Sequence, residues 1–135
     1  FKKIFLMVAG GAAKMQMDGK LNLKEEQELL CNCTDIMIDI FAAESLLLRV
    51  QKLQHFEHKP QPQSIYDAML QVFLHDATAR ISAHATDAVC AFTEGDLQKT
   101  FLMGIKRFAK YPPVNVKEQR RMVAGALRDG NGWKF

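Results

Sequence analysis

Apolar side chains recur along this chain at spacings of three and four residues, the period of a helix that buries one face. On the segment that ends near residue 53, one side collects Cys33, Ile36, Met37, Ile40, Leu47 and Leu48, and the other side collects Asp35, Asp39, Arg49 and Lys52. On the next long segment, Tyr66, Met69, Leu70, Phe73, Ala77 and Ile81 fall on adjoining rows. No stretch shows the sustained alternation that is typical of a β-strand. The pattern predicts an all-α chain.

Helix start and stop residues divide the chain into about five predicted helices. Four starts carry a capping residue followed three positions later by an acidic one: Asn22 with Glu25, Ser64 with Asp67, Thr93 with Asp96, and Asn115 with Glu118. The first predicted helix covers residues 2–17 and has a weak point at Gly10-Gly11. The others run from 22 to about 53, from 64 to about 91, from 93 to the prolines at 112 and 113, and from 115 to about 129.

The two longest predicted helices are connected by a segment that contains Pro60 and Pro62, which a helix interior does not tolerate. Long antiparallel helices joined in this way form a bundle. The chain has 135 residues, 48% of them hydrophobic, which suffices for one core and excludes a disordered chain. We therefore expect residues 1–135 to form a single antiparallel helical-bundle domain with two long central helices. Because the chain opens on Phe1 rather than Met, we expect it to be a fragment of a larger protein.

Charge is distributed unevenly along the chain. Residues 1–97 hold 9 basic and 13 acidic residues, whereas residues 98–135 hold 9 and 2. The basic residues of this last segment include Lys106, Arg107, Lys110, Lys117, Arg120, Arg121 and Arg128. They are candidates for a surface that meets an anionic membrane, a phosphorylated ligand or an acidic protein, and a solvated or interdomain face is the simpler alternative. Since no nucleic-acid-binding motif accompanies them, we expect no nucleic-acid partner.

Glu44 interrupts the apolar side of the second predicted helix, where an unpaired buried carboxylate would cost several kcal/mol. On the third predicted helix, one row at spacings of three and four contains Asp76, Arg80, His84 and Asp87. We expect Arg80 to pair with Glu44 inside the bundle, with Asp76 as a further acceptor. The favoured interpretation is a structural ion pair that fixes the helix register, and a catalytic carboxylate is the alternative.

The remaining patterns complete no catalytic, cofactor or metal site. His55 and His58 share a helical face, but no further ligand accompanies them, and we expect both to be exposed. Three cysteines, Cys31, Cys33 and Cys90, cannot close a disulfide framework. This number indicates a reducing, intracellular setting. We expect the chain in the cytoplasm or at the periphery of a membrane. We expect no catalytic, cofactor-binding or metal-binding residue in these 135 residues.

Several motifs follow one another in a fixed order: Asn22 to Leu30, Thr34 to Ser45, Asp76 to Ile81, the helix with Arg120-Arg121, and the terminal Asn131 to Phe135. In order and spacing they resemble the helical C-terminal extension of very-long-chain-type acyl-CoA dehydrogenases. The resemblance covers the chain from about residue 20 to its end.

The resemblance implies a parent flavoenzyme that uses FAD to oxidise fatty acyl-CoA at its α and β carbons. In that family the FAD site, the acyl-CoA pocket and the catalytic glutamate belong to the preceding dehydrogenase core. The extension would then be non-catalytic and would support that core or its homodimer, and in mitochondrial relatives it contacts the inner membrane. The alternative hypothesis is an autonomous helical module that binds an anionic membrane surface or a protein partner.

Overall fold

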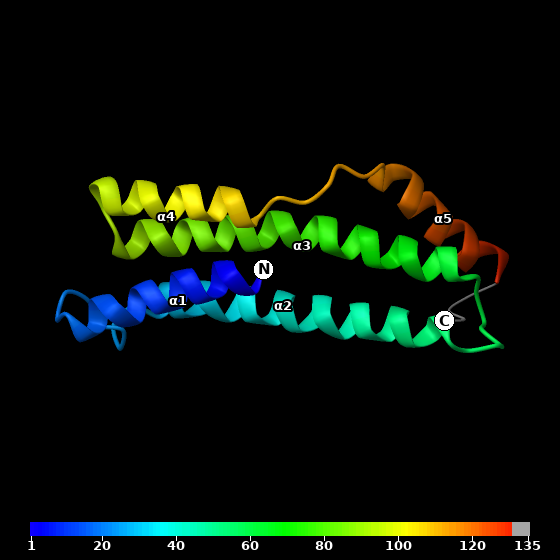
Figure 1. Cartoon of the computed structure of the whole chain (residues 1–135), viewed down its shortest axis with the longest axis horizontal. Coiled ribbons are helices and arrows are strands. Elements are labelled where there is room, and N and C mark those ends of the chain that lie inside the picture. The colour runs from blue at the N-terminus through cyan, green and yellow to red at the C-terminus, as the bar shows by residue number, and fades with distance from the viewer. Residues whose placement is uncertain (131–135) are drawn as a thin grey trace. The chain divides into compact units, whose positions relative to one another are not determined.

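The computed structural model describes residues 1–130, and over these residues the chain contains helices and no strand. The helices, labelled in Figure 1, are α1 (Lys2–Met17), α2 (Gln27–Gln54), α3 (Gln63–Phe92), α4 (Gly95–Phe108) and α5 (Val116–Asp129). The longest are α2, with 28 residues, and α3, with 30. The predicted all-α fold with two long helices is therefore confirmed. The terminal motif from Asn131 to Phe135 lies outside the described residues.

The chain folds into two compact units, and α2 and α3 each contribute one part to both. The first unit contains residues 1–40 and 78–111. Of the described residues, the second contains 41–77 and 112–130. Each unit has its own cluster of buried apolar side chains.

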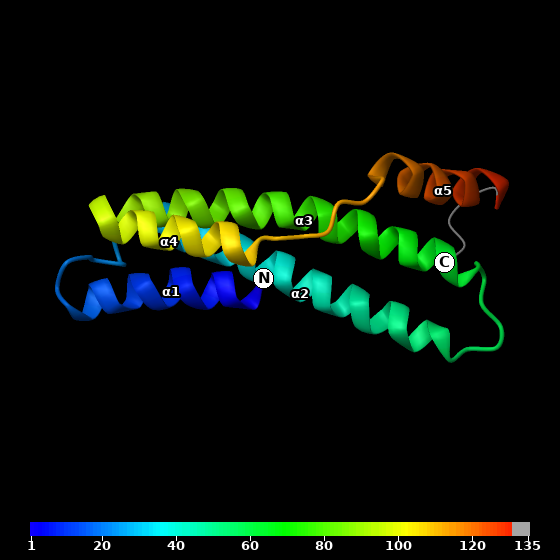
Figure 2. The ribbon, with the colours of Figure 1, turned by 45° about the horizontal axis from the view of Figure 1, so that its top comes forward.

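The first unit is built from α1, the first part of α2, the last part of α3, and α4 (Figures 1 and 2). Its core consists of Ile4, Val8, Ala12, Leu29, Ile36, Ile81, Ala85, Ala88, Val89, Phe92 and Ile105. α1 and α4 run antiparallel, because Lys3 Nζ lies 5.7 Å from the centre of the Phe108 ring while Gly11 faces Phe101. A Cβ at Gly11 would lie 2.6 Å from the Phe101 ring, so the close approach of these helices requires glycine there.

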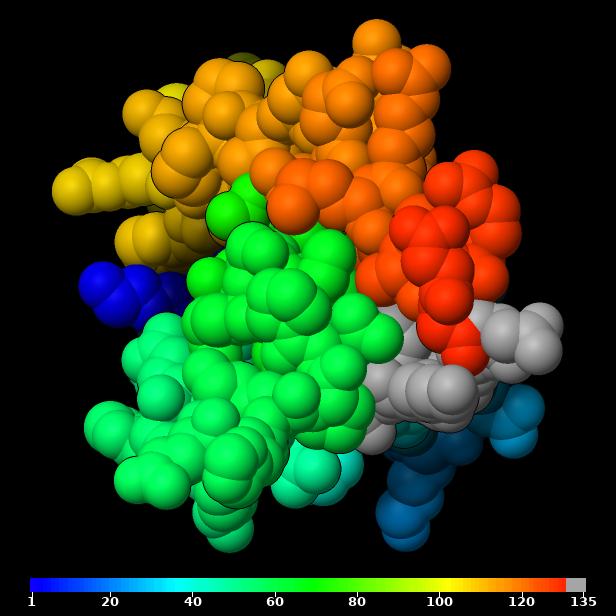
Figure 3. Space-filling model, turned by 90° about the vertical axis from the view of Figure 1, so that its right-hand side faces the viewer, coloured from blue at the N-terminus to red at the C-terminus, as the bar shows by residue number. Residues whose placement is uncertain are grey.

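The second unit is built from the last part of α2, the first part of α3, and α5. In its core, Val50 and Leu53 of α2 pack with Tyr66 of α3. Figure 3 shows α5, in orange to red, next to the first turns of α3, in green. The predicted start of α5 is confirmed, because the Asn115 side chain accepts a hydrogen bond from the Glu118 backbone N–H at 3.3 Å.

The predicted start of the second helix is wrong by several residues. The Asn22 side chain accepts a hydrogen bond from the backbone N–H of Lys24 at 3.3 Å, and this turn precedes the helix instead of opening it. The turn is held by Gln16, whose Oε1 accepts from the Leu23 N–H at 2.7 Å. As a result, α2 begins only at Gln27.

The predicted start at Thr93 also needs correction. The Thr93 hydroxyl donates to the Val89 carbonyl at 2.6 Å and so caps the end of α3 instead of the start of α4. Gly95 then reverses the chain with φ +61°, in the left-handed region that favours glycine. α4 begins at this glycine, with Glu94 as its first flanking residue.

The apolar side of α2 is buried only in part. In the first unit, Ile36 is fully buried, whereas Met37 remains 47% exposed. In the second unit, Leu48 remains 59% exposed. In the first unit, the apolar surface of α2 is therefore wider than the surface that α1, α3 and α4 cover.

Candidate functional site

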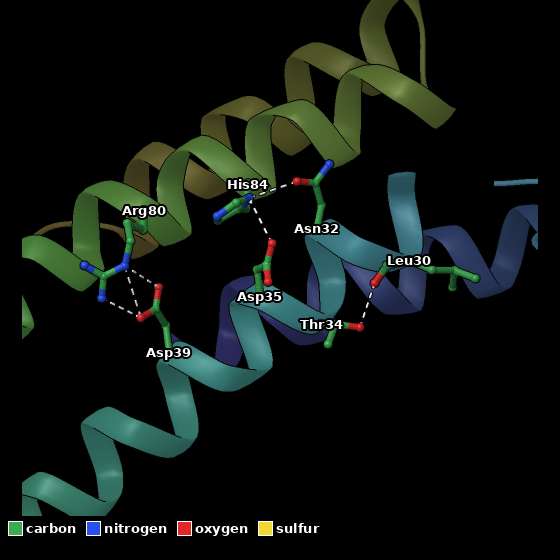
Figure 4. Close-up of polar contacts among 7 residues, drawn as sticks. All are labelled: Leu30, Asn32, Thr34, Asp35, Asp39, Arg80 and His84. Atoms are coloured by element: carbon green, nitrogen blue, oxygen red, sulfur yellow. Dashed lines mark hydrogen bonds and ion pairs between the residues drawn. The ribbon is translucent and has the colours of Figure 1, made fainter. Parts of the chain in front are cut away.

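A forked ion pair joins α2 to α3 in the first unit (Figure 4). The Arg80 Nε donates to both carboxylate oxygens of Asp39, at 3.2 and 3.0 Å, and Nη2 donates to Oδ1 at 2.6 Å. The Asp39 side chain is only 11% exposed, and the Arg80 side chain is 46% exposed. A forked contact between two planar groups holds both helices in one register.

His84 lies one turn further along α3 and makes the next contact between the same helices (Figure 4). Its Nδ1 lies 2.9 Å from Asn32 Oδ1, and Asp35 Oδ2 lies 3.9 Å from the same nitrogen. With Nδ1 protonated, the ring donates to the Asn32 amide oxygen. Asn32 is buried, so this hydrogen bond satisfies a group that water hardly reaches. We call Asn32, Asp35, Asp39, Arg80 and His84 the polar row.

The expected surroundings of Glu44 need correction. Glu44 is exposed, and the buried carboxylate that Arg80 contacts is that of Asp39. The hydrophobic pattern misses Asp39 because it assigns this residue to the polar side of its helix. A pair between Glu44 and Arg80 stays a prediction. The Asp76 carboxylate accepts two hydrogen bonds from Arg120 Nη2 of α5 in the second unit, at 2.8 and 3.0 Å.

The predicted basic residues belong to both units. In the first unit, Lys106 and Arg107 lie in the last turn of α4, where cations stabilise a helix C-terminus, and Lys110 follows. In the second unit, Arg120 and Arg121 of α5 each contact a carboxylate, at 2.8 Å. The two arginines therefore serve contacts within their own unit, and a shared basic binding surface stays a prediction.

An apolar groove lies between α1 and α2 in the first unit. It has a volume of about 450 Å³ and is lined by Phe5, Ala9, Ala12, Leu23, Leu29, Leu30, Cys33, Thr34 and Met37. The Thr34 hydroxyl donates to the Leu30 carbonyl at 2.8 Å, so the one hydroxyl of this lining is already engaged. Burial raises the pKa of the Cys33 thiol, because apolar surroundings disfavour the thiolate.

An open hollow of about 510 Å³ lies between the start of α3 and α5 in the second unit. Its lining consists of Gln61, Pro62, Ile65, Arg121, Met122, Gly125, Ala126, Asp129 and Gly130. Arg121 already donates to Glu118 at 2.8 Å. The hollow thus presents one arginine that is engaged on its own helix.

Over residues 1–130, no three His, Cys, Asp or Glu side chains lie together as a metal site would require. His55 and His58 are both exposed, as predicted. The three cysteines are free thiols, and Cys33 is partly buried. Within the described part of the chain, no helix has both the length and the apolar character needed to cross a membrane.

The fold and its contacts define a class of protein: an all-helical domain whose polar side chains link its own helices. A family model described as acyl-CoA dehydrogenase, C-terminal domain, matches residues 1–107. The chain belongs to this family.

Two relatives are similar over nearly the whole chain. A probable acyl-CoA dehydrogenase from Bacillus subtilis (strain 168) is 33% identical over 128 residues, which cover 93% of this chain and 20% of that protein. The crystal structure of an acyl-CoA dehydrogenase complexed with FAD from Bacillus anthracis is 31% identical with a TM-score of 0.85, over 96% of this chain and 22% of that chain. This chain therefore spans about a fifth of the length of the relatives that it matches.

Proposed function

We propose that this chain is the non-catalytic helical domain of an FAD-dependent acyl-CoA dehydrogenase that acts in fatty acid oxidation. Its role is to support the dehydrogenase core of that enzyme or its dimer. The observation that carries this proposal is the likeness to the FAD-complexed enzyme from Bacillus anthracis, over 96% of this chain and 22% of the other. The match supports this hypothesis over that of an autonomous module. Membership of the very-long-chain type stays a prediction.

The polar row supports a structural role for the acidic and basic residues of the first unit. Asp39 and Arg80 satisfy each other through three hydrogen bonds, and His84 contacts Asn32. None of these side chains lines the groove between α1 and α2. A catalytic acid or base must reach a bound substrate, whereas these groups face one another across two helices.

The residues of the two cavities do not fit FAD. A flavin with its pyrophosphate requires several backbone or side-chain donors, commonly at a helix N-terminus with a glycine-rich turn. The groove of the first unit is lined by apolar side chains apart from Thr34, whose hydroxyl is engaged. The hollow of the second unit has Arg121 as its cation, and Arg121 contacts Glu118. FAD is therefore assigned to the parent enzyme.

The partners follow from the same assignment. The first partner is the dehydrogenase core of the parent enzyme, and a homodimer is the second. The three free cysteines support an intracellular setting, and we propose the cytoplasm, with the basic residues available for peripheral membrane contact.

The direct test separates the two parts of the parent enzyme. We expect the dehydrogenase portion, expressed without these 135 residues, to form a stable complex with this chain in size-exclusion chromatography. We also expect the full-length polypeptide to oxidise acyl-CoA in a dye-reduction assay, and the 135-residue chain alone to show no turnover.

Two results would contradict the proposal. One is acyl-CoA oxidation by the 135-residue chain alone. The other is salt-sensitive cosedimentation of the chain with anionic vesicles, together with no binding to the dehydrogenase portion, which would indicate the autonomous module. Neutral vesicles at the same salt concentrations are the control.

A further inference from the structure

The groove between α1 and α2 is an apolar surface without an occupant among the described residues. Two of its lining side chains, Leu30 and Met37, remain 44% and 47% exposed although they sit beside the buried Leu29 and Ile36. Apolar side chains clustered in a hollow mark a binding surface more strongly than scattered ones do. The groove therefore resembles one side of a protein–protein interface.

The uncharged, apolar lining of the groove indicates which kind of molecule can bind there. No lining residue carries a charge, and the Thr34 hydroxyl already donates to the Leu30 carbonyl at 2.8 Å. A polar ligand would lose its hydrogen bonds to water in this groove and find no replacement for them. An anionic membrane surface would find no cation in the lining. Apolar side chains of a polypeptide require neither hydrogen bonds nor a cation from the lining.

The family match indicates where such a polypeptide segment is found. All nine lining residues lie within residues 1–107, the part that matches the family model. This chain covers only 20% and 22% of the two relatives. The relatives are therefore about five times as long as this chain. A groove in the shared part thus has four-fifths of such an enzyme available to cover it.

We propose that the groove between α1 and α2 is the seat of an apolar segment from the dehydrogenase portion of the same polypeptide. This inference rests on the proposed function and specifies which surface carries it. Leu30 and Met37 contact the segment from α2, Phe5 and Ala9 contact it from α1, and Cys33 lies beneath it.

The test compares two double variants in the full-length polypeptide. Leu30→Gln with Met37→Gln alters the groove, and Leu97→Gln with Met103→Gln is the matched control on α4. The control residues are of the same types and are 47% and 63% exposed, but they lie outside the groove lining. Glutamine keeps the size and the charge state, so that only apolar character is lost.

The Cys33 thiol reports occupation of the groove directly. In the full-length polypeptide we expect alkylation of Cys33, followed by mass spectrometry, to be about tenfold slower than in the 135-residue chain. The groove variant removes most of this protection and lowers the temperature at which flavin is released, and the control variant changes neither. In the 135-residue chain, both variants melt at nearly the same temperature, since their side chains are already partly exposed.

Three results would overturn the inference. Equal reactivity of Cys33 in the flavin-loaded full-length polypeptide and in the 135-residue chain means that the groove is open. Protection that rises with protein concentration means that a second copy is the occupant. A full-length polypeptide that holds no flavin overturns the proposed function and, with it, this inference. The first two leave the proposed function standing, so the failures are distinguishable.

Discussion

Neighbouring glycines in α1 offer a sharp test of helix packing in the first unit. Replacing Gly10 by alanine adds a Cβ with nothing within 4 Å. Replacing Gly11 by alanine adds a Cβ at 2.6 Å from two atoms of the Phe101 ring and 3.3 Å from Phe92. The two rings pack edge to face, with centroids 5.8 Å apart at 83°, so neither ring can turn away without losing that contact.

The two substitutions share their effect on helix propensity and differ in packing. Alanine gains about 0.8–1 kcal/mol over glycine in a helix interior, and Gly10→Ala is expected to stabilise the chain by roughly this amount. At Gly11 the same gain is set against overpacking, which costs about 1–3 kcal/mol in a filled core. Gly11→Ala should therefore destabilise by about 0–2 kcal/mol, and the two variants should differ by about 1–3 kcal/mol.

Urea unfolding, monitored by circular dichroism at the helix band, measures the free energy of unfolding of the Gly10→Ala and Gly11→Ala variants. Phe101→Leu in the Gly11→Ala background is the control, because a smaller side chain should relieve the clash and give a favourable coupling in the double-mutant cycle. If Gly11→Ala stabilised the chain as much as Gly10→Ala does, the close packing of α1 on α4 would be refuted.

Three further predictions concern the polar contacts and the thiols. Arg80→Ala should lower the free energy of unfolding by about 1–3 kcal/mol in the same urea assay, because it leaves the Asp39 carboxylate buried without its arginine. A decrease below about 0.5 kcal/mol would contradict a stabilising role for the contact between Arg80 and Asp39. Arg120→Ala should cost at most about 1 kcal/mol, since its pair with Asp76 is solvent-exposed, and a larger loss would mean that the pair is buried. Because burial raises the pKa of Cys33, its alkylation in the folded 135-residue chain should be slower at pH 8 than in the same chain unfolded in urea, and its rate should rise at a higher pH. Equal pH profiles of Cys33 alkylation in the two states would contradict this prediction.

Much of the fold is predictable from local chemistry, because helix periodicity and prolines act over short stretches of chain. The start of α5 at Asn115 is an example, since its capping hydrogen bond involves residues three positions apart. The starts near Asn22 and Thr93 fail because the same side chains have competing partners nearby. Asn22 closes a turn, and Thr93 reaches back to Val89.

The polar row is harder to predict because it depends on which sides of two helices meet. The sequence identifies Arg80 and His84 as members of one row, and these two side chains do contact α2. Asp76 of the same row contacts Arg120 of α5 instead. It does not identify Asp39, because a charged residue beside other charged residues is indistinguishable from a solvated one until the neighbouring helix is placed. Glu44 illustrates the opposite error, since an apolar surrounding on one helix does not guarantee burial.

The central proposal is that these residues form a helical domain that supports a flavoenzyme and binds no flavin of its own. The most direct test is a titration with FAD in which binding is monitored by quenching of the flavin fluorescence. It compares the full-length polypeptide with the 135-residue chain. We expect the full-length polypeptide to bind FAD at a one-to-one ratio and the 135-residue chain to leave the fluorescence unchanged. Saturable FAD binding by the 135-residue chain, or none by the full-length polypeptide, would contradict the claim.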